Sequence, residues 1–474
     1  MLGIIEVFTR RLVLILALGL NCTPAFAAES QLDGRALGAI WVLPFAGMLL
    51  SIALMPLLLP VFWHRHYGKV SAFWALAFLL PATFLFGVPS TGHELLHVLA
   101  LEYIPFLILI GALYCVTGHI YIRGNLHGSP GLNTGLLALG TGLASIMGTT
   151  GAAMLLIRPL IRANDDRRYN VHVIIFFIFL VANIGGSLTP LGDPPLFLGF
   201  LQGVSFSWTL SHLLAPMLLT SAILLAIFFA LDFHLYRKEG RRRPDPTPDG
   251  KVSIEGVRNL LLIPAILVVV LASGSFKLGE IHVLSLTLEV QNILRDLLLL
   301  LIAYVSFSTT PHGTRLANDF NFEPVIEVAK LFAAIFITIV PVIAMLKAGR
   351  DGALASVIAL VTTPEGQPID SMYFWLTGSL SSFLDNAPTY LVFFNAAGGD
   401  AQQLMGPLAS TLTAISAGAV FMGANSYIGN APNFLVKSIA ESRGISMPSF
   451  FGYMLWSGCL LLPIFAVLTV IFFR

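Results

Sequence analysis

Long apolar runs, separated by short polar segments, make up most of the chain. Four runs in the first half are close to the ~20 apolar residues that a membrane-spanning helix needs. They lie at about 37–63, 70–88, 103–122 and 210–231. Comparable runs in the second half lie at about 260–272, 296–307, 325–346 and 450–473. The pattern predicts an all-α polytopic membrane protein, in which the shorter runs extend into their flanks.

Two further apolar stretches, at 131–161 and 371–397, are too short for two crossings. Two crossings and a turn need more than ~40 residues. Basic residues flank the first stretch on both sides, so both of its ends are expected in the cytoplasm. We therefore expect two re-entrant helical hairpins, which enter the membrane from opposite sides. Their tips are predicted near Gly148-Thr149-Thr150-Gly151 and near Ser382 to Thr389.

Each hairpin is followed by an apolar run that is interrupted by glycine, proline and asparagine. The interruptions lie at 183–195 and 423–433. Glycine and proline disfavour a continuous helix, so both runs are predicted to be discontinuous transmembrane helices. Broken backbone at membrane depth is tolerated only where protein or a cavity satisfies the freed polar groups.

The two halves therefore share one order: three spans, a hairpin, a broken span and a final span. Five crossings per half make about ten spans, and the odd number inverts the second half. The predicted units are a signal peptide, a first repeat, a cytoplasmic linker and a second repeat. Their bounds are 1–27, 28–236, 237–256 and 257–474. Inverted repeats with discontinuous helices are typical of secondary transporters.

The N-terminus has the pattern of a signal peptide. Arg10 and Arg11 precede an apolar stretch that is too short to span a bilayer, and Ala25-Phe26-Ala27 is a cleavage motif. Cleavage would leave the mature N-terminus outside the cytoplasm, in the inner membrane of a bacterium. The alternative is a short first helix that stays attached.

Composition narrows the class of protein further. Only 11% of residues are charged and 56% are hydrophobic, with a mean hydropathy of +0.85. Soluble domains have about 25% charged residues. A soluble enzyme, a disordered chain and a nucleic-acid binder are thereby excluded, and the lipid bilayer is the expected partner. Three widely spaced cysteines give neither a disulfide framework nor a metal-ligand spacing.

The candidate site is formed by the polar residues of the two tips and two breaks. They are Thr149, Thr150, Asn183, Thr189, Asp193, Asp385, Asn386, Thr389, Asn425, Ser426, Asn430 and Asn433. Amide, hydroxyl and unwound carbonyl oxygens suit hard cations. Asp193 and Asp385 are expected to lie at matching places in the two halves. A buried carboxyl group can hold a proton or a cation, and their competition is the basis of antiport. The alternative is that each aspartate only caps a helix.

The motifs at these positions resemble those of the NhaD-type sodium/proton antiporters. These belong to the ion transporter superfamily, together with citrate and arsenite transporters. The similar segments are 148–152, 183–195, 383–389 and 423–433. The resemblance implies exchange of cytoplasmic Na+ (or Li+) for external H+ in a homodimer, with Asp193 and Asp385 carrying the ion and no cofactor. Asn430 departs from the aspartate that this pattern leads us to expect.

A carboxylate carrier of the same superfamily is the second interpretation. Related dicarboxylate carriers hold carboxylates with Ser-Asn-Thr tips, whereas the tips here read Gly-Thr-Thr and Asp-Asn-Ala-Pro-Thr. An acidic tip repels an anion and favours a bare cation. Cation-coupled transport of citrate or another carboxylate remains the alternative to Na+/H+ exchange.

One motif points to a different class of protein. His93-Glu94-Leu95-Leu96-His97 matches the H-E-x-x-H sequence of zinc proteases. The segment is expected in an outside loop, and the candidates for a third ligand are Glu102 and Asp193. A protease would not explain the inverted halves, so we interpret the match as chance. A pH-sensing cluster and a solvated loop are the milder alternatives.

Overall fold

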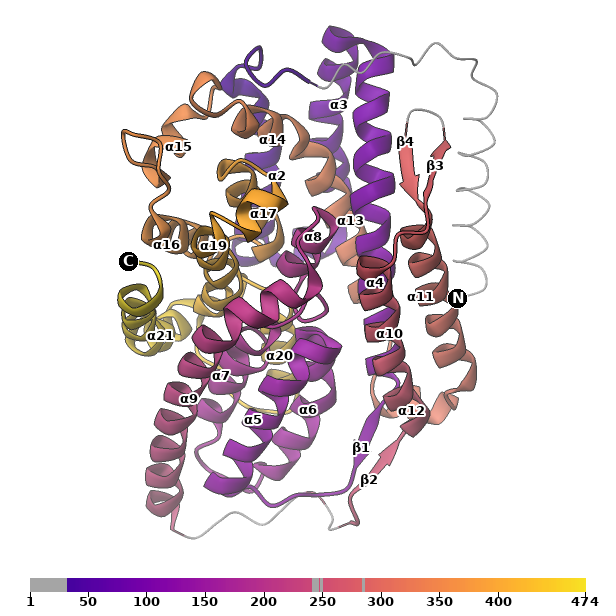
Figure 1. The fold of residues 1–474 in the computed structure, drawn as a ribbon. Coiled ribbons are helices and arrows are strands. Elements are labelled where there is room, and N and C mark those ends of the chain that lie inside the picture. Colours follow the sequence, from indigo (N-terminus) through magenta and orange to yellow (C-terminus); the bar gives the residue numbers. More distant parts are fainter. Residues whose placement is uncertain (1–31, 241–246, 248–249, 284–285) are drawn as a thin grey trace.

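The computed structural model describes residues 32–240, 247, 250–283 and 286–474. The predicted signal peptide lies outside these residues. Within them the fold is almost entirely helical (Figure 1). The strands form two small antiparallel pairs. β1 (Tyr121–Arg123) pairs with β2 (Ser253–Glu255), and β3 (Glu280–Val283) pairs with β4 (Leu286–Glu289).

Seven helical segments of the described chain are long and apolar enough to cross a membrane. They are Ala39–Leu58, Pro60–Gly118, Phe206–Glu239, Val257–Ser275, Val290–Thr309, Glu323–Lys347 and Phe450–Phe472. At 1.5 Å per residue, Pro60–Gly118 would be ~90 Å long, far more than one bilayer. It bends at Gly87 (φ 83°), and Phe78 and Leu95 on either side of the bend line one pocket. With this division and two interrupted helices, the predicted all-α bundle of about ten spans is confirmed.

The helices form two packed groups. We name the first group the framework. It consists of α2 (Leu43–Leu58), α3 (Pro60–Val98), α4 (Ile104–Gly118), α10 (Val257–Ser275), α11 (Val290–Thr309) and α13 (Glu323–Thr338). Its main contacts are α13 on α3, α11 on α4, and α2 on α3. Short helices join the long ones. They are η1 (Ala39–Val42), η2 (Leu99–Tyr103), α12 (His312–Ala317), α14 (Val340–Lys347), η4 (Gly349–Asp351), α15 (Ala355–Val361) and α18 (Ala401–Met405).

The second group, the hairpin group, contains both re-entrant hairpins and both broken helices. Its first-half members are α5 (Pro130–Met147), α6 (Thr149–Ala163), α7 (Val171–Leu180), η3 (Ile184–Ser187), α8 (Pro194–Leu201) and α9 (Phe206–Glu239). Its second-half members are α16 (Asp370–Ser381), α17 (Asn386–Ala396), α19 (Ala409–Met422), η5 (Gly423–Asn425), α20 (Ala431–Ser442) and α21 (Phe450–Phe472). In Figure 1 the first hairpin extends from the lower end and the second from the upper end. The predicted order and inversion of the two halves are therefore present.

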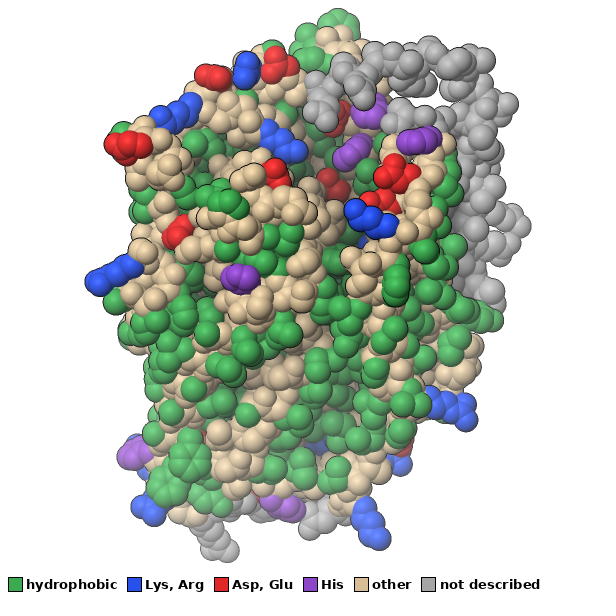
Figure 2. All heavy atoms as spheres, in the orientation of Figure 1, with side chains coloured by type: hydrophobic (Ala, Val, Ile, Leu, Met, Phe, Trp, Pro, Cys, Tyr) green, Lys and Arg blue, Asp and Glu red, His purple; other side chains and the backbone are tan. Residues whose placement is uncertain are grey.

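The core of the hairpin group lies around α7. Every residue from His172 to Leu180 is buried, and a helix that is apolar on all sides belongs inside a bundle. The outer surface is different. Figure 2 shows a hydrophobic middle and charged side chains mainly at the two ends of the molecule. This distribution fits a bilayer around the middle of the bundle.

A buried charge cluster closes the base of the first hairpin. Asp232 on α9 is fully buried, and its carboxylate lies 2.6 Å from Arg167 Nη1 and 2.9 Å from His172 Nε2. Asn133 on α5 donates to the same carboxylate at 2.9 Å. Arg167 also pairs with Glu239 at 3.3 Å. The cluster ties α5, the loop after α6, α7 and α9 together.

The base of the second hairpin is simpler. Asp370 begins α16, and its carboxylate accepts a 2.6 Å hydrogen bond from the Thr411 hydroxyl on α19. The two hairpins are thus anchored by different chemistry at equivalent ends.

Two local predictions were wrong. The turn between the first two spans was expected at 64–69, but α2 ends at Leu58 and α3 begins at Pro60. Proline cannot continue the preceding helix and favours the first position of the next one. The His93–His97 segment was expected in a loop, but it is helical within α3. Gly87 and Pro89 break the chain just before it, and a new helix starts there.

Candidate functional site

The two helix breaks have the same backbone geometry. In each, the chain crosses itself where two glycines touch. A Cβ atom on Gly192 would lie 2.1 Å from the Gly186 carbonyl oxygen, and one on Gly429 would lie 2.6 Å from that of Gly423. Only glycine permits such an approach. Gly423 lies 237 residues after Gly186, and Gly429 lies 237 residues after Gly192. This common offset aligns the first break with the second.

Each break is bonded to its own hairpin in the same way. Thr189 Oγ1 donates to the Ser145 carbonyl at 2.5 Å, and Ser426 Oγ donates to the Ser382 carbonyl at 2.5 Å. Both hydroxyls also accept a hydrogen bond from the amide two residues later, at 3.1 Å and 3.2 Å. These bonds satisfy backbone groups that the breaks set free.

Sequence reasoning missed two serines that complete this arrangement. The Ser145 hydroxyl donates to the Gly185 carbonyl, and the Ser382 hydroxyl donates to the Met422 carbonyl at 3.1 Å. Both serines also follow the 237-residue offset. Each stands three residues before its tip residue, Gly148 or Asp385. Alignment of the two halves at this offset would have revealed them.

The same offset shows which site residues are equivalent. Thr149 corresponds to Asn386, and Asp193 corresponds to Asn430. The expectation that Asp193 and Asp385 occupy matching places is therefore wrong. Asp193 precedes α8 in a break, whereas Asp385 precedes α17 at a hairpin tip. The two carboxylates do not follow the 237-residue offset that relates the backbones of the two halves.

Asp193 lies where both tips and both breaks meet. Its side chain is 1% exposed. Thr149 Oγ1 and Asn430 Nδ2 donate to Oδ1 at 3.0 Å and 3.1 Å, and Asn386 Nδ2 donates to Oδ2. The donors belong to α6, the second break and α17. One carboxylate thus joins four elements from both halves.

Buried asparagines link the two breaks behind Asp193. Asn183 Nδ2 donates to Asn433 Oδ1 at 2.7 Å, and Asn430 Nδ2 lies 3.3 Å from Asn183 Oδ1. Asn433 in turn donates to the carbonyls of Gly423 and Ser426 at 2.8 Å and 2.9 Å. The amides hold the broken backbones together without any charge.

Two amide oxygens in the site are free to bind a ligand. Asn386 Oδ1 and Asn425 Oδ1 are buried and accept no hydrogen bond from the described chain. An unsatisfied buried polar atom costs ~1–3 kcal/mol. A ligand that needs oxygen donors would remove this cost.

The two aspartates differ in what their side chains do. Asp385 is half-buried, and its Oδ1 accepts from the Ala387 amide at 3.1 Å, as a helix cap does. Asp193 precedes α8 but makes no capping bond to it. The capping alternative therefore describes Asp385, whereas the Asp193 carboxylate faces the centre of the site.

The remaining predicted residues lie around this centre. Thr150 is in the first turn of α6, and Thr389 is in the first turn of α17, where its hydroxyl donates to the Asp385 carbonyl at 2.9 Å. Asn425 Nδ2 donates to Ser382 Oγ at 2.9 Å. Within the described residues, neither aspartate of the site forms an ion pair. The site thus presents neutral donors and oxygens to an unpaired carboxylate.

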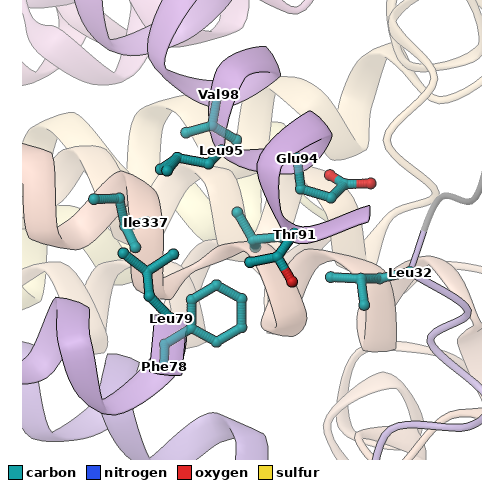
Figure 3. A pocket seen from close by; sticks show the side chains of 9 residues that line it. Leu32, Phe78, Leu79, Thr91, Glu94, Leu95, Val98 and Ile337 are labelled. Carbon is teal, nitrogen blue, oxygen red and sulfur yellow. The ribbon is translucent and has the colours of Figure 1, made fainter. Parts of the chain in front are cut away.

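The histidine motif forms no metal centre in the part of the chain that the structure describes. No group of three His, Cys, Asp or Glu side chains there could hold a metal ion. The rings of His93 and His97 have centroids 6.4 Å apart. Glu94 lines a small pocket in which Thr91 is the other polar residue (Figure 3). The proposed third ligands, Glu102 and Asp193, do not join the two histidines.

The fold and site define a membrane protein of the secondary transporter class, with inverted hairpins and broken helices around one buried carboxylate. The sequence matches, over residues 34–473, the model of a family described as "Putative citrate transport". The chain belongs to this family, which is consistent with the ion transporter superfamily suggested by its motifs. No curated protein matches the sequence.

Proposed function

We propose that the protein is a Na+/H+ antiporter in which Asp193 binds the two ions in turn. The observation that supports this most directly is the unpaired, buried carboxylate among neutral donors. An unpaired charge inside a membrane protein is costly. A proton or a Na+ ion neutralises it, and the two cannot occupy it together.

The surrounding side chains suit both states. Thr149, Asn386 and Asn430 donate to the carboxylate when no cation is bound. Each of them also carries an oxygen that can turn towards a cation, and Na+ is a hard cation that takes such ligands. Asn386 Oδ1 and Asn425 Oδ1 add oxygens that are free already. Binding of Na+ would therefore expel the proton from Asp193 and replace its hydrogen-bond donors with oxygen ligands.

The second candidate function is cation-coupled transport of citrate or a related carboxylate. It is favoured by the family to which the chain belongs. A citrate anion carries up to three negative charges, and the residues around Asp193 offer amide and hydroxyl donors only. Such a substrate would need accompanying cations to approach the two aspartates.

An assay in everted membrane vesicles separates the two functions. A pH gradient is built by respiration, and its collapse is followed by fluorescence dequenching. Addition of Na+ or Li+ is expected to collapse it, and vesicles with Asp193→Asn serve as the control. No response to either ion, together with uptake of labelled citrate, would replace antiport with the second candidate.

The cellular setting belongs to the same proposal. We place the protein in the inner membrane of a bacterium, with its mature N-terminus outside and as a homodimer. Cross-linking in membranes tests the dimer, and protease accessibility of a tag placed after residue 27 tests the orientation.

A further inference from the structure

We infer that the exchange is one Na+ for one H+ and moves no net charge, and that Asn430 sets this ratio. The inference rests on the proposed antiport function. Its basis is the symmetry of the two breaks, because the position equivalent to Asp193 in the second break holds an amide, which does not titrate.

The geometry of the two central positions is equivalent. Asp193 and Asn430 each follow a self-crossing glycine loop and directly precede a half-helix, α8 or α20. Neither side chain caps its own half-helix. They meet at the centre, where Asn430 Nδ2 donates to Asp193 Oδ1 at 3.1 Å. Two residues in equivalent places thus form one pair, and only one member is titratable.

Asp385 does not supply a second proton site in this arrangement. Its Oδ1 accepts from the Ala387 amide as the cap of α17, and within the described chain it is bonded to neither Asp193 nor Asn430. It is also less buried than Asp193. Its charge attracts cations, and the inferred ratio requires that this charge stays constant through the exchange.

Charge balance follows from one titratable group. The protonated site is Asp193–COOH. Binding of Na+ releases that proton and leaves a carboxylate–Na+ pair, so the site is neutral in both states. If Asn430 were an aspartate, two carboxyl groups ~3 Å apart would face each other, and adjacent carboxylates retain a proton strongly. Exchange of two protons for one Na+ would then move one net charge per cycle.

Purified protein in proteoliposomes tests the ratio. A membrane potential is imposed with a K+ gradient and valinomycin, and radioactive Na+ uptake is measured against a fixed pH gradient. For exchange that moves one charge, ~100 mV shifts the equilibrium Na+ ratio by roughly 50-fold. In the unaltered protein, the potential is expected to leave the equilibrium Na+ ratio unchanged. Asn430→Asp is expected to respond to the potential.

The outcomes are distinct. Exchange by the unaltered protein that responds to the potential would overturn the inferred ratio and leave the antiport function standing. Absence of Na+/H+ exchange would overturn the antiport function and the ratio with it. If Asn430→Asp fails to fold, the measurement on the unaltered protein still decides the ratio.

Discussion

The first and second helix breaks share one backbone but not one chemistry. Both have the crossing glycines, the hydroxyl bonded to the hairpin carbonyl and the half-helix that follows. The first break ends in Asp193 and the second in Asn430. The hairpin bases also differ in charge. A buried charge cluster lies at the base of the first hairpin, and the Asp370–Thr411 hydrogen bond lies at the base of the second. The repeated backbone positions the site. The ion chemistry depends on the side chains that differ between the two halves.

The largest effect on exchange is expected when Asp193 in the first break is replaced by asparagine, the residue at the equivalent position of the second break. Asp193→Asn removes the titratable group from the centre, and exchange should fall to the level of vesicles without the protein. The amide can still accept from Thr149 and Asn430, so the protein level should stay normal. Vesicle dequenching and immunoblotting measure the two quantities. Full exchange by this variant would remove Asp193 from the mechanism.

Substitutions at the two hairpin bases should reduce the stability of the fold by different amounts. Asp232→Asn leaves Glu239 as the ion partner of the buried Arg167 and should destabilise the fold by ~3 kcal/mol, because Arg167 and His172 both lose a hydrogen bond to a charged group. Thr411→Ala removes one hydrogen bond and should cost about 1 kcal/mol. Thermal unfolding in detergent compares them. Equal losses would show that the charge cluster has no special role.

The crossing glycines offer a comparison within one motif. Gly192→Ala places a methyl group against a backbone carbonyl at 2.1 Å and should cost ~3 kcal/mol or more. Gly429→Ala meets the equivalent carbonyl at 2.6 Å and should cost ~2 kcal/mol. The unfolding temperatures of the two variants show which substitution destabilises the protein more. A reversed order would contradict the backbone distances described above.

The smallest effect is expected at the tip aspartate. The sequence motifs imply that Asp385 carries the ion, but its side chain caps α17, and asparagine caps a helix as well as aspartate does. The Asp385→Asn variant should keep its stability and lose only a fixed charge. We expect the Na+ concentration for half-maximal exchange to rise ~5-fold, since one nearby charge contributes about 1 kcal/mol. Complete loss of exchange would restore Asp385 as an ion carrier.

The sequence predicted the parts of the fold that depend on local chemistry. Glycine and proline marked both tips and both breaks, and the length of each apolar run separated hairpins from spans. It was wrong about the partner of Asp193 and silent about Ser145, because both depend on which segments meet in space. The predicted position of the first turn is wrong because the basic residues at 64–69 have the composition of a loop, whereas Pro60 already starts the next helix.

The charge cluster at the base of the first hairpin has a consequence for biosynthesis. Asn133 enters the chain 99 residues before Asp232, and His172 enters it 60 residues before. The first hairpin and α7 must therefore emerge from the ribosome while their acidic partner is still unmade. Asn133 and Asn164 can already bond to each other at 2.8 Å and 2.9 Å, but the charge cluster can form only once α9 has been synthesised. Synthesis of the last helix of the first repeat thus neutralises the buried Arg167 at the base of the re-entrant hairpin.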